Sequence, residues 1–339
     1  MSVFICFEDT LFPPIPPSKP MKLLRKYDLR KSDSLPLISY TICYQFHREK
    51  CVAGRQKIPE KVKQTLRREV GFGCPVQGCA NPYLEYHHFD PPVKVKPHNN
   101  PEGMIALCAQ HHKKADGGAY TNEQLHALKK DKANANDVKG NLDWLRRDLL
   151  AVVGGVFYYE TLNIVRIDGV DVVSLDRDEE GYLRLSINML SLSSEERIVI
   201  DKNSWERVGY PSDLRSPPQG KELEVSYSNG DYLYLRFWEL KTKEQAQSRY
   251  NSSMLNHLRF PITAIEVNLA IAGTGINLSP DKTTIGGLNL MGGLIENCGV
   301  GVCVEGSGFR WLQNSVAQRQ ESILEIEGNV ISVQFRRPK

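Results

Sequence analysis

The chain has 339 residues, of which 41% are hydrophobic and 24% are charged, and these values are typical of a soluble protein long enough for two domains. No run of 18 apolar residues predicts a transmembrane helix and the first 20 residues do not resemble a secretory signal, so we expect a cytoplasmic protein without a membrane partner. The net charge of +3 is unevenly spread: residues 1–140 carry 22 Lys and Arg against 14 Asp and Glu, a basic half that suggests a polyanionic partner.

Residues 1–56 are rich in proline at first and then basic and irregular, and we expect them to be partly disordered. The stretch "IPEKVKQTLRREVGFGC" that follows predicts a helix. Pro59 suits its first turn, apolar residues recur every four positions from Val62 to Val70, and Gly71 ends it. A second helix should begin at the capping box formed by Thr121 and Gln124.

Residues 133–153 are interpreted as a polar linker or helix. From residue 154 onward, runs such as "YLRLSINML" alternate apolar and polar side chains, and "SNGD" predicts a hairpin turn at Asn229-Gly230. Two glycine-rich units of about twenty residues, starting near Thr263 and Thr283, indicate a short β-solenoid, and a β-sandwich is the alternative. The expected fold class is therefore α+β, with a small metal-binding domain at residues 57–132 and an all-β domain at residues 154–339.

Two close pairs of potential metal ligands lie about thirty residues apart. Cys74 and Cys79 are separated by four residues, and Cys108 and His111 by two. Each pair can bind one ion as a turn, so the spacing predicts a four-coordinate structural Zn²⁺ site. The alternative is a group of buried free thiols. A structural zinc would replace a hydrophobic core that this short segment is too small to supply.

Three further histidines lie in two doublets around the same segment. His87 and His88 are adjacent, and His112 follows the proposed zinc ligand His111. Asp116 is four residues after His112, so a helix would place both on one face. One imidazole from a strand, one imidazole from a helix and a carboxylate form a mixed nitrogen and oxygen site that leaves coordination positions open for water and phosphate. Such a site is typical of a divalent metal that catalyses hydrolysis.

The order "C-x4-C … EYHHFDPP … HNNPEGMIALCAQHH" resembles the HNH endonucleases, the ββα-metal nucleases, in their form with a zinc knuckle. The resemblance covers residues 59–132. It includes the intervals of fifteen residues from His88 to Gly103, nine from Gly103 to His112 and four from His112 to Asp116. It implies a ββα-metal fold and hydrolysis of phosphodiester bonds in nucleic acid, with DNA favoured over RNA.

By this resemblance, His88 is the catalytic general base, and the divalent ion is bound by His87, His112 and Asp116. The catalytic ion would be Mg²⁺, which is abundant in cells, or Mn²⁺ or Ni²⁺, which accept imidazole ligands more readily. The family's metal element contacts the nucleic-acid backbone, so basic side chains nearby are candidate phosphate contacts. These candidates are Lys61, Lys63, Arg67, Arg68, Lys113 and Lys114.

The sequence departs from the family at Gly103, where the family usually has an asparagine that supports the loop near the general base. If the missing side chain limits the rate, Gly103→Asn should increase cleavage and keep both metals. The alternative function is a catalytically impaired, zinc-stabilised nucleic-acid-binding or sensor module. Two-part bacterial defence proteins provide a further analogy, in which the β-rich half targets or restrains a nuclease.

Overall fold

The computed structural model describes residues 2–6, 57–207, 209–311 and 330–334. The described residues from 58 onward belong, together with the first strand, to one compact unit. The region expected to be irregular, residues 1–56, lies outside the described residues apart from residues 2–6. Residues Ser2–Cys6 form strand β1, which pairs with strands near the other end of the chain, so this short segment is ordered by β-pairing instead of being unstructured.

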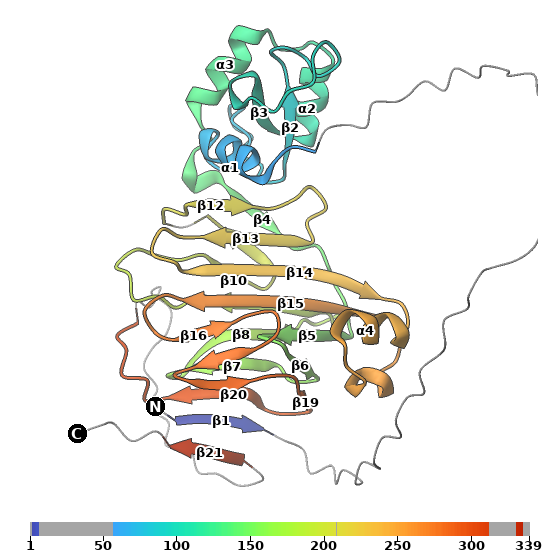
Figure 1. Ribbon diagram of the computed structural model, residues 1–339, viewed down its shortest axis with the longest axis vertical. Coiled ribbons are helices and arrows are strands. Elements are labelled where there is room, and N and C mark those ends of the chain that lie inside the picture. The colour runs from blue at the N-terminus through green and yellow to red at the C-terminus, as the bar shows by residue number, and fades with distance from the viewer. Residues whose placement is uncertain (1, 7–56, 208, 312–329, 335–339) are drawn as a thin grey trace, which may run out of the picture. The chain divides into compact units, whose positions relative to one another are not determined.

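Residues 58–132 form an antiparallel hairpin with helices around it (Figure 1). Its hydrophobic cluster includes Leu66, Leu84, Ile105 and Leu107, all of which are buried. The two strands run side by side from Leu84 opposite Cys108 to His88 opposite Met104. In chain order the elements are α1 (Glu60–Glu69), β2 (Leu84–His88), the 3-10 turn η1 (Pro101–Gly103), β3 (Met104–Cys108), α2 (Ala109–Asp116) and α3 (Asn122–Asp131).

Local sequence signals explain where these helices begin and end. Pro59 precedes α1, and Leu66 and Val70 are fully buried, as the four-residue period predicts. Gly71 has φ +75°, a left-handed conformation that ends the helix at low steric cost. Thr121 caps α3 through the predicted capping box. Both predicted helices are confirmed.

Residues 139–311, with β1 and β21, form two sheets. Among the described residues the first sheet has nine strands. In spatial order they are β21 (Val330–Gln334), β1 (Ser2–Cys6), β20 (Val300–Glu305), β7 (Asn163–Ile167), β8 (Val170–Arg177), β9 (Leu183–Asn188), β10 (Val199–Asp201), β11 (Ser204–Glu206) and β4 (Lys139–Asn141).

The second sheet branches at its longest strand, β15, which pairs with β14 on one side and with both β5 and β16 on the other. The strands of the main path are, in order, β12 (Asp213–Arg215), β13 (Glu222–Ser226), β14 (Tyr232–Leu240), β15 (Ile262–Ile271), β16 (Ile276–Leu278), β17 (Thr283–Ile285) and β18 (Leu288–Leu290). The branch consists of β5 (Leu149–Val153), β6 (Val156–Tyr159) and β19 (Leu294–Glu296).

One hydrophobic cluster includes inward-facing residues of both sheets, such as Ile187 and Trp205 from the first and Leu235 and Val267 from the second. Two sheets that share a core in this way form a β-sandwich. On the outer side of β5 and β15, a second cluster packs against the helix α4 (Lys243–Tyr250) and the turn η3 (Met254–His257). The protein is therefore α+β and mostly β.

Three expectations about this half need correction. Successive strands from β15 to β18 pair antiparallel in hairpins, so the twenty-residue units do not stack as the parallel coils of a solenoid. The half contains α4, so it is not all-β. Residues 133–153 contain the turn η2 (Ala135–Asp137), an edge strand and the buried strand β5, so they are part of the sandwich and not a linker or helix.

The predicted hairpin at "SNGD" does join β13 to β14. Of its two central residues, Gly230 has the left-handed conformation, at φ +97°, and Asn229 does not.

Candidate functional site

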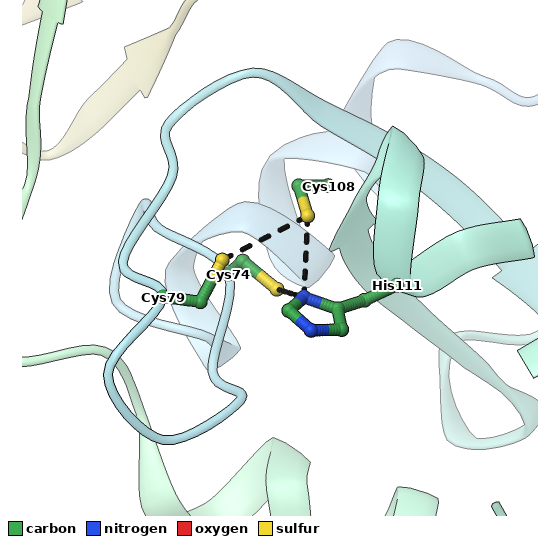
Figure 2. A group of neighbouring side chains, drawn as sticks. All are labelled: Cys74, Cys79, Cys108 and His111. Carbon is green, nitrogen blue, oxygen red and sulfur yellow. Dashed lines mark hydrogen bonds between the residues drawn. The ribbon is translucent and has the colours of Figure 1, made fainter. Parts of the chain in front are cut away.

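Four potential metal ligands converge between the loop after α1 and the start of α2 (Figure 2). Cys74 and Cys79 come from that loop, Cys108 ends β3, and His111 lies in the first turn of α2. The Sγ atoms of Cys74 and Cys108 each lie 3.3 Å from Nδ1 of His111. The Sγ atoms of Cys79 and Cys108 are 3.8 Å apart. The two pairs that are separated in the sequence thus form one cluster.

These separations are close to the edges of a zinc tetrahedron. Bond lengths of about 2.3 Å for Zn–S and about 2.0 Å for Zn–N predict edges of about 3.8 Å between two sulfurs and about 3.5 Å between sulfur and nitrogen. The sulfur pair has the first value, and the sulfur–nitrogen pairs are only slightly shorter than the second. Three cysteines and one histidine are also a common donor set of structural zinc sites. The cluster can therefore hold a metal ion such as zinc.

Burial sets the protonation of these ligands. It raises the pKa of the Cys74 thiol to about 12, and it raises the pKa of Cys79 as well. Burial lowers the pKa of His111, which keeps this imidazole neutral near pH 7. The two thiols therefore hold their protons at neutral pH unless a cation displaces them, so protons and metal compete for the same atoms.

A second group of donors lies on β2 and α2. Nδ1 of His87 is 3.1 Å from one carboxylate oxygen of Asp116, and Nε2 of His112 is 3.8 Å from the other. One donor atom from each of the three residues lies within 4.8 Å of the others. His87 is buried. Burial, and to a smaller extent the nearby His112, lowers the pKa of His87, so its imidazole is in the neutral, metal-binding form. Asp116 is exposed, which leaves this group open to solvent.

The carboxylate of Glu85 orients His112. Its Oε2 lies 2.6 Å from Nδ1 of His112, so the ring presents Nε2 toward Asp116. A carboxylate that holds the second nitrogen of a metal-binding histidine is a frequent feature of metal sites, because it fixes the ring and its tautomer. Glu85 is not among the site residues predicted from the sequence. The available signal was its spacing of two from His87, which places both side chains on one face of a strand.

His88 has surroundings different from those of His87. The strand continues in regular register through both residues, opposite Ile105 and Met104. Nε2 of His88 lies 3.0 Å from the backbone carbonyl of His98. Because a carbonyl only accepts hydrogen bonds, Nε2 carries the proton, and neutral His88 has its lone pair on Nδ1.

Gly103 is buried where the loop after β2 crosses η1. A Cβ atom at this position would overlap the backbone carbonyl oxygen of Asp90, and would lie 2.7 Å from its carbonyl carbon and 3.1 Å from Cε1 of His98. Gly103→Asn would therefore require the loop to move, because the loop backbone already fills the space that the side chain needs.

The basic residues on α1 divide into two groups. Arg67 is 2% exposed and pairs with Asp213 on β12, and Arg68 donates to the carbonyl of Ser212. These two arginines hold α1 against the sandwich, and Arg67 has no exposed guanidinium to offer to a phosphate. Lys61 is exposed on α1, and Lys63 lies 3.4 Å from a carboxylate oxygen of Glu60.

Other exposed lysines are close in the sequence to the second group of donors. Lys113 and Lys114 are exposed on α2. Lys94 and Lys96, which the sequence analysis did not select, are exposed on the loop after β2. These four lysines are closer in the sequence to His87 and His112 than the lysines of α1 are. They remain candidates for phosphate contacts.

No family model, no curated protein and no solved structure matches this chain. Within the described part of the chain, no helix has the length and apolar character needed to cross a membrane.

Proposed function

We propose that the protein is a metal-dependent endonuclease of the HNH, or ββα-metal, type. The observation that supports this best is the group of His87, His112 and Asp116, with His88 next to it on the same strand. The hairpin β2–β3 followed by α2 is the order of elements that the name ββα describes. The Cys₃His cluster at the junction of β3 and α2 fits the zinc-knuckle form of that family.

The donor chemistry fits a catalytic divalent ion. Two neutral imidazoles and one carboxylate suit Mn²⁺ or Ni²⁺, and Mg²⁺ is the abundant cellular alternative. When bound, such an ion stabilises negative charge on the phosphate and the leaving oxygen. His87 and His112 would hold it from the buried side, and Asp116 from the solvent side. Glu85 keeps Nε2 of His112 directed at the site.

His88 would act as general base. Its Nε2 proton is held by the carbonyl of His98, so its Nδ1 lone pair is the atom that takes a proton from water. Lys113 and Lys114, together with Lys94 and Lys96, would bind the phosphate backbone on either side of the cleaved bond. Contacts of this kind carry little sequence information, so we expect weak sequence preference. DNA is the favoured substrate over RNA.

A nicking assay tests this proposal. Purified protein is incubated with supercoiled plasmid and, separately, with Mg²⁺, Mn²⁺ or Ni²⁺. The wild type should nick the plasmid with at least one ion, and His88→Ala should nick it much more slowly. If neither protein nicks DNA or cleaves RNA with any ion while both bind nucleic acid, the protein is a zinc-stabilised binding or sensor module and the proposal is wrong.

A further inference from the structure

The side chain of His98 holds together the loop between β2 and η1. Nε2 of His98 lies 2.9 Å from the carbonyl of Pro91, and Nδ1 accepts from the backbone N–H of Asn100 at 3.1 Å. Because the carbonyl can only accept, Nε2 must carry the proton, so both ring nitrogens are engaged in the neutral form. The ring thereby links the beginning of the loop to its end.

His98 also contacts His88 in two ways. Its backbone carbonyl accepts the Nε2 proton of His88 at 3.0 Å. Its ring packs edge-on against that of His88, with centroids 5.1 Å apart and planes at 86°. The position and tautomer of His88 therefore depend on where His98 is held.

The close packing of the loop on Gly103 explains why a residue of the loop, His98, is the one that supports it. The N–H groups of Phe89 and Asp90 both donate to the carbonyl of Gly103, at 3.0 and 3.2 Å, and this brings the loop directly onto the glycine. The space for a side chain at position 103 is taken by the carbonyl of Asp90 and the edge of the His98 ring. Any side-chain support for the loop must come from another position, and His98 is within the loop itself.

We propose that His98 is a positioning residue for cleavage, and that it supplies from inside the loop the support that an asparagine at position 103 supplies in the HNH family. This inference rests on the proposed function. His98 acts through His88: its carbonyl holds the proton on Nε2, and its ring keeps that carbonyl in place by binding Pro91 and Asn100.

The test compares His98→Ala and His98→Gln with wild type in the plasmid assay, with kcat and KM determined separately. Glutamine has an NH₂ group that donates and a carbonyl oxygen that accepts, at about the reach of the imidazole, so it can restore both loop contacts. We expect His98→Ala to lower kcat about 10- to 100-fold with KM changed less than about twofold, and His98→Gln to recover most of the loss. The control His257→Ala removes an exposed histidine of the sandwich and should leave kcat unchanged.

Nitrogen NMR of the histidine rings at pH 8 gives a second measurement that needs no activity. Wild-type His88, assigned by comparison with His88→Ala, should show the tautomer protonated at Nε2. In His98→Ala it should show a mixture of both tautomers.

The outcomes separate the two proposals. A wild type that cuts under no ion contradicts the proposed function, and the tautomer of His88 then decides the positioning role alone. If the wild type cuts and His98→Ala cuts with the same kcat, this inference is wrong. It is also wrong if His98→Ala loses zinc or folding and is not restored by glutamine, because that result indicates a purely structural role.

Discussion

Arg67 on α1 and Asp213 on β12 form a bidentate ion pair in which the Arg67 side chain is buried. Nε of Arg67 lies 3.0 Å from one carboxylate oxygen and Nη2 lies 2.6 Å from the other. Nη1 also donates to the hydroxyl of Tyr86 at 2.8 Å, one residue before His87 on β2. Burial lowers the pKa of Arg67, but Asp213 and Tyr86 together, through hydrogen bonds and charge, raise it by more, so the net shift of this pKa is upward. The pair joins the strand of the candidate site to the edge of the sandwich.

Asp213→Ala should therefore destabilise the protein substantially, because it leaves a buried guanidinium without its main partner. We expect the free energy of unfolding to fall by about 2–4 kcal/mol, since Glu60 and Tyr86 still bind Arg67. Chemical denaturation measures this change. The control Asp171→Ala removes the more exposed pair with Arg166 and should cost less than about 1 kcal/mol. Equal losses in the two variants would show that burial of the Arg67 pair is unimportant.

Zinc should be an integral part of the fold. Metal analysis of purified protein is expected to give about one tightly held zinc per chain, and Cys108→Ser should lose it together with solubility, because the small cluster around β3 depends on the metal. Cys303→Ser is the matched control: Cys303 is also a buried free cysteine, but it lies on β20 outside the cluster. A folded, soluble wild type without any metal would contradict this prediction.

Zinc retention should fall as the pH is lowered. Burial raises the pKa of Cys74 to about 12 and raises that of Cys79, so at neutral pH zinc binds by displacing protons from these thiols. Raising the pH removes the competing protons and tightens binding, and lowering it weakens binding by about tenfold per pH unit for each proton displaced. Titration from pH 8 to pH 5 with a zinc-sensitive dye measures the release. Retention independent of pH would mean that the cysteines are not the ligands.

The two histidine doublets should show separate roles under mutation. His88→Ala should slow nicking about 10²- to 10⁴-fold, the usual range for loss of a general base, while Mn²⁺ affinity stays near that of wild type. His112→Ala should weaken Mn²⁺ binding and keep the structural zinc on His111. Calorimetry for Mn²⁺ and metal analysis for zinc distinguish these effects. If His88→Ala nicks as fast as wild type, the assignment of the base is wrong.

Gly103→Asn should reduce cleavage and stability, in contrast to what the family pattern alone suggests. The new side chain would have to displace the carbonyl of Asp90 and the ring of His98, so the loop that holds His88 would move. Gly103→Ala should already show the effect, because the clash begins at Cβ. The rates are measured beside Gly299→Ala, a glycine of the sandwich that has no positive φ and has open space around it. A faster Gly103→Asn enzyme would contradict the loop arrangement described above.

The helices of the metal-binding segment followed from local signals. The four-residue period of α1 and the capping box of α3 are interactions between residues close in the sequence, so they can be identified without knowing the fold. The membership of the Cys₃His cluster could also be predicted, because each half is a pair of residues close in the sequence. The separation of His112 and Asp116 by one helical turn likewise placed them on one face.

Pairing over long distances decided the rest. Leucines and valines spaced by glycine in the region of β15 to β20 suit a solenoid coil or a hairpin equally well, and only the strand partners distinguish them. The charge on Arg67 suggested a phosphate contact, but Asp213, 146 residues away, binds it in the interior. At Gly103 the sequence determined only that a side chain is missing. The tertiary structure decided what replaces it, because the returning loop brings Asp90 and His98 into that space.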